Sequence, residues 1–205
     1  MKRFLILAVV VFLGAGSKLF ADDYIAPVWR GEEGSTMQVW EFSQSDVTPA
    51  PDIVHNPYGN PLLSADSEGW IPTKDGRQGI WPLSGEIDVY LPNRPEILPE
   101  KRIWLQLVWK PGEQDSPFLP DAPMVGVVPF DKMTATRTDT PMDGGWTHSV
   151  FAIEMWPNPV EEWITVKGDI LVDELVIDTI CIPEPGTIGL LTLGGLTLLG
   201  RRRRR

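Results

Sequence analysis

Cysteine is almost absent from this chain of 205 residues, which holds a single one, Cys181. One cysteine excludes an internal disulfide, even in an oxidising compartment where disulfides persist. Cys181 can then either pair with a second molecule or act as a small, buried, apolar residue. Because it falls at the end of the last predicted strand, we favour the second interpretation.

Basic residues are scarce in the middle of the chain. Of the 18 Lys and Arg residues, three lie in residues 1–21 and five in residues 201–205. The body, residues 22–182, therefore holds ten basic against 27 acidic residues, a formal balance of −17 where the whole chain has −10. Phosphate recognition draws most of its affinity from Lys and Arg, so we predict no nucleic-acid partner. The acidic balance suits solubility at a surface, or cation binding.

Recognisable catalytic patterns are also missing. The chain has no G-x-S-x-G nucleophile elbow, and His55 and His148 show no metal-ligand spacing. Carboxylate pairs for glycoside hydrolysis are unspecific among 27 acidic residues, and we interpret Glu161 and Glu162 as solvated loop charge. We therefore predict no catalytic residue and no enzyme, with a secreted hydrolase as the second alternative to the function below.

A calcium loop is the nearest approach to a cofactor site. Asp139 and Asp143 lie four residues apart, beside Gly144 and Gly145, but the fuller EF-hand pattern is absent. We interpret the segment as a turn, and predict no metal site and no cofactor.

Helical periodicity is lacking, whereas alternation with a period of two recurs. Twenty prolines make long helices improbable. Short strands with turn signals between them predict a mainly β fold, an antiparallel β-sandwich of the jelly-roll or carbohydrate-binding-module kind. The predicted strands are residues 36–42, 86–91, 101–110, 124–128, 146–156, 163–166 and 170–180.

The last two predicted strands carry two local signals. Lys167, Gly168 and Asp169 predict a hairpin turn between them. Within residues 170–180, the apolar positions change phase after Val172, which predicts a β-bulge near residues 173–174.

Long apolar runs are confined to the two ends. At the N-terminus, Lys2 and Arg3 precede ten apolar residues, 4–13, and small residues that end at Ala21. This pattern predicts a secretory signal peptide, residues 1–21, that is cut after Ala21. An uncleaved anchor is the alternative, although the apolar run is short for one.

The C-terminus carries three segments in a fixed order. Pro183, Glu184 and Pro185 lie directly before an uncharged apolar run, residues 187–200, and five arginines, residues 201–205, follow. A helix over residues 185–200 would be about 24 Å long at about 1.5 Å per residue, short of a hydrocarbon core of about 30 Å. The arginines favour a cytoplasmic end. A buried core helix and a permanent tail anchor are the alternatives.

These three segments resemble the PEP-CTERM sorting signal of exported bacterial proteins. The resemblance covers residues 183–205 and implies recognition by exosortase, a membrane protease-transpeptidase, with Pro183, Glu184 and Pro185 as the sorting motif. It further implies export through the general secretion machinery, a transient inner-membrane anchor on one membrane-spanning helix, and release to the cell surface or the extracellular space. For the body it implies nothing about activity.

Nine tryptophans are many for this length. Trp70, Trp81 and Trp146 lie in or beside loops rich in Gly or Pro, where exposed indoles could stack on sugar rings, although we favour core packing for most of the tryptophans. We therefore predict a cell-surface or extracellular-matrix protein with a structural or adhesive β-sandwich body. The alternative is a glycan-binding module for exopolysaccharide.

Overall fold

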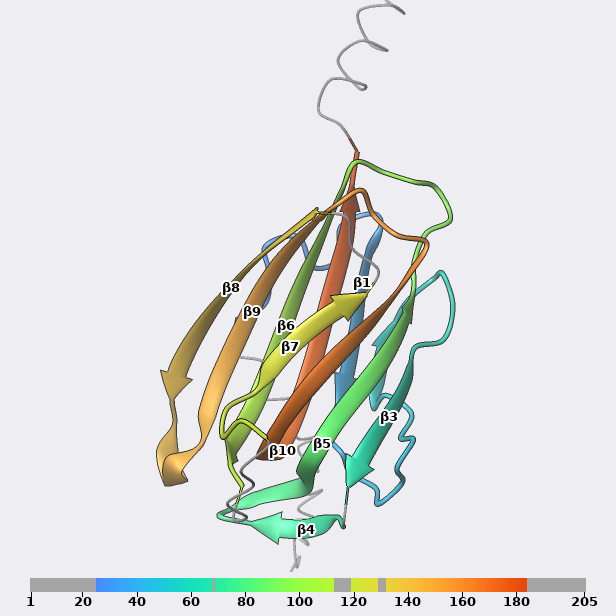
Figure 1. The fold of residues 1–205 in the computed structure, drawn as a ribbon. Coiled ribbons are helices and arrows are strands. Elements are labelled where there is room, and N and C mark those ends of the chain that lie inside the picture. Colours follow the sequence, from blue (N-terminus) through green and yellow to red (C-terminus); the bar gives the residue numbers. More distant parts are fainter. Residues whose placement is uncertain (1–24, 68, 113–118, 129–131, 184–205) are drawn as a thin grey trace, which may run out of the picture.

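The computed structural model describes residues 25–67, 69–112, 119–128 and 132–183. These residues form ten strands and one 3-10 turn (Figure 1). The strands are β1 (Ser35–Trp40), β2 (Ile53–His55), β3 (Leu62–Ser67), β4 (Ile71–Lys74), β5 (Arg77–Pro92), β6 (Glu100–Pro111), β7 (Met124–Val128), β8 (Lys132–Pro141), β9 (Thr147–Trp156) and β10 (Glu161–Ile182), with the turn η1 (Asp143–Gly145) before β9.

β10 is the strand around which the sheet is arranged. All of its pairings are antiparallel: its first half lies between β5 and β7, and its second half lies between β1 and β6. The sheet then continues from β6 through β9 to β8, from β1 to β2, and from β5 to β3 and β4. The predicted mainly β, antiparallel fold is thereby confirmed, while the sandwich type stays a prediction.

The two halves of β10 run in different directions (Figure 1). The predicted hairpin at residues 167–169 is wrong, because these residues continue the pairing of β10 with β5. Gly168 lies opposite Gly85, and both positions are crowded: a Cβ at Gly85 would lie 3.0 Å from the Asp66 side chain, and one at Gly168 would lie 3.3 Å from the Pro120 carbonyl oxygen. The predicted bulge is confirmed, since the register of β10 against β6 shifts between Val172 and Glu174.

The core takes side chains from both halves of the sheet. One buried cluster joins Ile87 and Val89 of β5 to Leu105 of β6 and Ile153 of β9. β10 adds Ile164, Val166, Ile170 and Val172 before the bulge and Leu175 and Ile177 after it. The bulge therefore keeps apolar side chains of both halves in the core.

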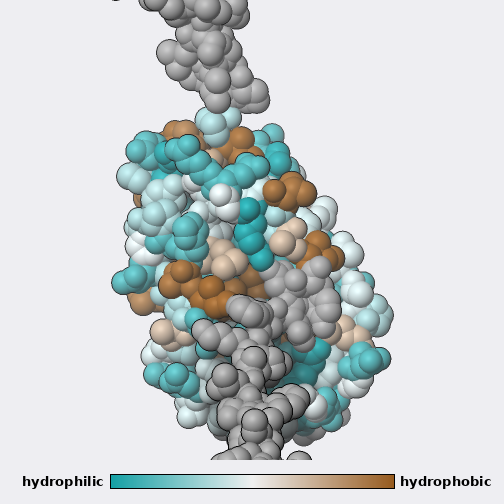
Figure 2. All heavy atoms as spheres, turned by 180° about the vertical axis from the view of Figure 1, so that it is seen from behind, coloured by the Kyte–Doolittle hydropathy of each residue, from teal (hydrophilic) through white to brown (hydrophobic). Residues whose placement is uncertain are grey.

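Four strands lie where no strand was predicted. β2 and β3 fall in a segment rich in Pro and Asp, β4 falls near Trp70, and β8 is exposed along nearly its whole length. Seen from behind, the described surface is mostly hydrophilic, with small apolar patches among polar residues (Figure 2). None of the described residues forms a helix long and apolar enough to cross a membrane.

Candidate functional site

The last strand leads directly into the sorting motif. β10 ends at Ile182, and Pro183 follows it as an exposed residue. Cys181 and Ile182 pair with Lys101 and Glu100 at the beginning of β6. The predicted recognition residues Glu184 and Pro185, and the predicted membrane-spanning segment and arginine tail, lie outside the described residues.

A buried polar cluster lies beside this exit. Lys101 and Glu162 are both 0% exposed, and Lys101 Nζ donates a hydrogen bond to Glu162 Oε1 at 2.5 Å. Asn93 joins them: its Oδ1 accepts a hydrogen bond from Lys101 Nζ, and its Nδ2 donates to Glu162 Oε2. The cluster is thus a closed triangle of one amine, one carboxylate and one amide.

Three strand ends bring this cluster together. Asn93 directly follows β5, Lys101 is the second residue of β6, and Glu162 is the second residue of β10. The main-chain nitrogen of Asn93 donates a hydrogen bond to the Val160 carbonyl at 3.1 Å. The side-chain Nδ2 of Asn93 also donates to the Pro159 carbonyl at 2.9 Å. The carbonyl groups of residues 159 and 160 therefore fix both the main chain and the side chain of Asn93. The interpretation of Glu162 as solvated loop charge is wrong.

Cys181 is buried at the end of β10, as we expected for a small apolar residue of the last strand. Burial raises the pKa of its thiol, an effect that the nearby Lys101 ammonium opposes and the Glu162 carboxylate reinforces. The thiol is therefore held in its neutral form.

The structure buries two of the three tryptophans that we considered as possible sugar-stacking residues. Trp81 and Trp146 are each 1% exposed, Trp81 in the main core and Trp146 packed with Ile80, Val108 and Leu171. Trp70 is half-buried, and its Nε1 donates to the Phe42 carbonyl at 2.7 Å. A sugar-stacking role for Trp81 and Trp146 is therefore wrong, because Trp81 lies on β5 with its side chain in the core and Trp146 is buried directly before β9.

A different aromatic pair faces solvent where β5 pairs with the first half of β10. Tyr90 of β5 and Trp163 of β10 are register partners whose ring centroids lie 5.2 Å apart, and Trp163 is 45% exposed. Leu62 pairs with Tyr90 and Val128 pairs with Trp163, so the four side chains form one outward row across β3, β5, β10 and β7. We call Leu62, Tyr90, Trp163 and Val128 the front row.

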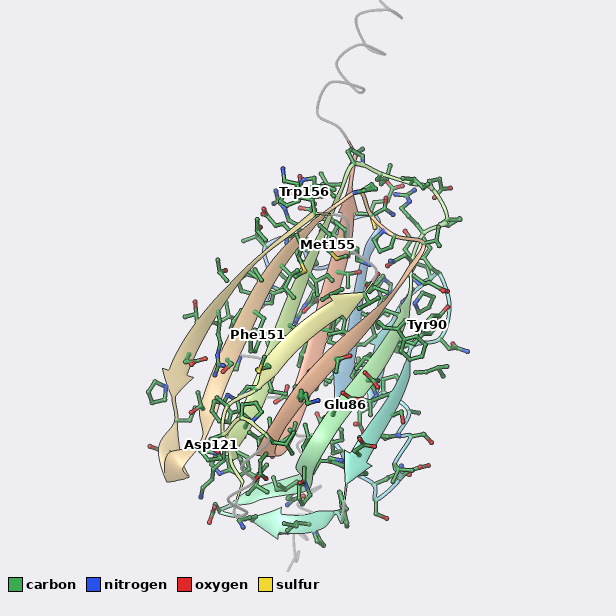
Figure 3. The ribbon with its side chains drawn as sticks, in the orientation of Figure 1. Glu86, Tyr90, Asp121, Phe151, Met155 and Trp156 are labelled. Atoms are coloured by element: carbon green, nitrogen blue, oxygen red, sulfur yellow. The ribbon has the colours of Figure 1, made fainter. Side chains whose placement is uncertain are left out.

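Polar groups flank the front row. Tyr90 Oη donates to Glu161 Oε2 at 2.8 Å, and this hydrogen bond raises the pKa of Tyr90. In the next row of the same face, Thr165 Oγ1 donates to Asp88 Oδ1 at 2.6 Å. Figure 3 shows Tyr90 and Glu86 along β5. The exposure of Trp163 could have been predicted from the sequence. Trp163 alternates in phase with the polar residues Thr165 and Lys167, and the positions between them are apolar.

The candidate calcium loop is a turn only in its second half, because residues 139–141 belong to β8. Asp139 lies on β8, where its Oδ1 accepts hydrogen bonds from Arg137 Nε at 2.7 Å and Ser149 Oγ at 2.6 Å. Burial raises the pKa of Asp139, but these two hydrogen bonds outweigh it, so the pKa is lowered. Asp143 to Gly145 form the 3-10 turn η1. Within the part of the chain that the structure describes, no three His, Cys, Asp or Glu residues gather as metal ligands.

A pocket of about 640 Å³ lies where the β4–β5 turn meets the end of β8 and η1. Asp75, Arg77, Asp143 and His148 contribute polar groups to its wall. Lys110 Nζ donates to Asp75 Oδ2 at 2.8 Å, which lowers the pKa of Asp75, and Arg77 pairs with Asp173. His148 is buried and shares a hydrogen bond of 3.2 Å with Gln106.

Comparison with protein families finds the PEP-CTERM protein-sorting motif at residues 182–205. The chain carries a PEP-CTERM protein-sorting motif at its C-terminal end. The matched segment begins at the last residue of β10, and the motif implies export and membrane-anchored transit before exosortase processing. Searches of curated proteins and of solved structures return no match for the chain.

Proposed function

We propose that this protein is a non-enzymatic component of the cell envelope or extracellular matrix, whose β-sandwich body is released to the surface once exosortase has cut the tail. The proposal rests on the junction between the folded body and the sorting tail. The segment that matches the sorting family begins at Ile182, the residue that ends β10, so the motif residue Pro183 follows the strand directly. Recognition at the motif therefore takes place next to a folded body rather than at the end of a long linker.

The position of the junction suits a structural or adhesive role. Force on the C-terminus would act along β10, which is paired with β6 up to Ile182 and with β1 up to Ile180. Antiparallel hydrogen bonds lie perpendicular to the strands, so such a force loads many of them together instead of opening them one by one. A body that is attached to the envelope through the end of β10 therefore resists unfolding when it is pulled from that end.

Changing the acidic residue of the motif tests the sorting function. We expect Glu184→Ala to leave a full-length precursor in the membrane fraction, because the exosortase would lose the central residue of its recognition motif. Glu154→Ala, a substitution on exposed β9 surface, is the matched control and should be processed normally. Normal processing of Glu184→Ala, read by intact mass and membrane fractionation, would contradict the proposal.

The front row supports glycan binding as the second candidate function. Exposed aromatic and apolar side chains gathered on one face commonly mark a binding surface, and two adjacent rings present flat apolar area to a sugar. Asp88, Thr165 and Glu161 add polar groups for sugar hydroxyls next to the rings. The occupant that fits is a polysaccharide chain lying across β5 and β10.

Titration with polysaccharide from the producing cells tests this second function. The intrinsic fluorescence of the folded protein should change on titration, and Trp163→Ala should abolish the change. Trp156→Ala, which removes a half-buried tryptophan on β9 stacked by Lys132, should leave the response intact. A response that survives Trp163→Ala, or no response at millimolar sugar, rules out the front row as a glycan site.

A further inference from the structure

Lys101, Glu162 and Asn93 form a reactive arrangement as well as a polar one. Lys101 Nζ contacts the carbonyl oxygen of the Asn93 side-chain amide, the group whose carbon an amine attacks. Glu162 contacts both reaction partners, with Oε1 at Lys101 Nζ and Oε2 at Asn93 Nδ2. The full burial of Lys101 and Glu162 keeps water, the competing nucleophile, away.

We propose that Lys101 and Asn93 become joined by an intramolecular isopeptide bond, formed by the folded protein itself, with Glu162 as the group that moves the protons. The bond links Lys101 Nζ to Asn93 Cγ and covalently connects the end of β5 to the beginning of β6. The inference stands apart from the sorting motif and the front row, and concerns the chemistry of the body alone.

The reaction needs no cofactor and no oxidant. The Lys101 ammonium first gives one proton to Glu162 Oε1 along the existing hydrogen bond, which leaves a neutral amine. Nζ then attacks Asn93 Cγ and gives up its second proton, the Cγ–Nδ2 bond breaks, and Nδ2 takes up one of the two protons through Glu162 Oε2 and leaves as ammonia. One proton remains, either on Glu162 or on the released ammonia as ammonium.

Burial favours each of these steps. Two opposite charges out of water are costly even when they are paired, so the first proton transfer, which neutralises both groups, is less unfavourable here than at the surface. The product replaces a buried ion pair with a neutral amide. Asn93 donates hydrogen bonds from its main-chain nitrogen to the Val160 carbonyl and from Nδ2 to the Pro159 carbonyl, and these bonds hold its side-chain amide beside Lys101, which supplies the proximity that the reaction requires.

Peptide mapping of the full-length protein tests the bond. Arg94 is followed by Pro95, so the first tryptic cut after Asn93 falls at Lys101. Without the bond, trypsin releases peptide 78–101 at its full mass. With the bond, Lys101 is no longer a cutting site, and we expect peptide 78–102 with a mass lower by one ammonia. Full-mass peptide 78–101 from folded protein would overturn the proposal.

A second digestion separates the bond from a succinimide at Asn93, which also loses ammonia. Glu96 and Glu100 lie between the two joined residues. Cleavage after both should leave the piece containing Asn93 attached to the piece containing Lys101. If the two pieces separate, the loss of ammonia has another origin and the isopeptide bond is excluded.

Two variants test the role of Glu162. Glu162→Gln keeps the size of the side chain but cannot accept the ammonium proton, so Lys101 should become a tryptic site again and the peptide should regain its full mass. Glu161→Gln changes the exposed neighbour and should leave the bond intact. A bond that still forms in Glu162→Gln would remove Glu162 from the mechanism.

Discussion

Lys101 lies opposite Cys181 in the antiparallel register of β6 and β10, one residue before β10 ends. The buried cluster and the exit of the sorting tail therefore share one end of the sheet. Lys101 reaches from this position to Asn93 and Glu162, so the strands that meet at the exit are joined through side chains as well as through the backbone. The end of the body that leads into the sorting tail therefore contains a buried polar cluster.

Loss of the Lys101 amine should destabilise the body strongly. Lys101→Met removes the proposed bond and leaves the Glu162 carboxylate buried without its cation, a change that typically costs about 3–5 kcal/mol. Urea denaturation followed by tryptophan fluorescence measures it. Lys110→Met, on the same strand, breaks only a partly exposed pair with Asp75 and should cost about 1 kcal/mol or less. Equal losses in both variants would contradict the burial of the cluster.

Truncation of two tryptophans should lower the stability by very different amounts. Trp81→Ala empties a site in the main core and should lower the free energy of unfolding by about 3–5 kcal/mol. Trp163→Ala removes an exposed ring and should cost much less, while it abolishes any glycan response. Thermal melts of the two variants, compared with the wild type, check the first expectation. A Trp81→Ala variant as stable as Trp163→Ala would show that Trp81 lies at the surface.

A glycine at the beginning of β5 should tolerate no side chain. Gly79 has φ +75°, and a Cβ there would lie 2.4 Å from the Glu41 carbonyl oxygen, a backbone atom that cannot move freely. We expect Gly79→Ala to destabilise the protein by about 1–3 kcal/mol or more, through overpacking added to backbone strain. Gly76→Ala is the control, because Gly76 has a similar φ of +83° but open space around it. If both variants melt at the same temperature, the contact with Glu41 is absent.

The Cys181 thiol should make stability depend on alkaline pH. Burial raises the pKa of this thiol above its ordinary value of 9.0, so the folded state holds the proton more tightly than the unfolded state. The stabilising contribution is present below the ordinary thiol pKa and is lost as the pH rises through the raised value. We expect the free energy of unfolding to fall more steeply above about pH 9 in the wild type than in Cys181→Ala, whose other titrating groups are the same. Parallel curves would refute this expectation.

The sequence predicted elements wherever one face of a strand is apolar and the other polar. Residues 86–91 were placed correctly on β5 for this reason, residues 101–110 were placed on β6 because both faces of that segment are largely apolar, and the change of phase after Val172 located the bulge. β8 could not be found in this way, because both of its faces are exposed and its side chains show no alternation. Gly168 was misread as a hairpin turn because its partner, Gly85, is 83 residues away in the chain, and such pairing is invisible to a local pattern.

The candidate sites were harder to predict than the strands. Glu162 follows another glutamate, and two adjacent carboxylates normally indicate solvent; only the arrival of Lys101 and Asn93 from two other strand ends explains its burial. Trp81 and Trp146 lie beside glycines, which suggested exposed loops, yet tertiary packing buries both. The sorting tail, in contrast, is a linear signal that needs no folded partner, and sequence alone was sufficient to identify it.

The mass of the protein recovered from its own cells tests the central claim most directly, because that claim makes residues 183–205 a temporary signal. We predict a mature chain that ends within or near the motif, without Arg201–Arg205, and that begins after Ala21. A recovered protein that still carries its terminal arginines would show a lasting tail anchor and contradict the account.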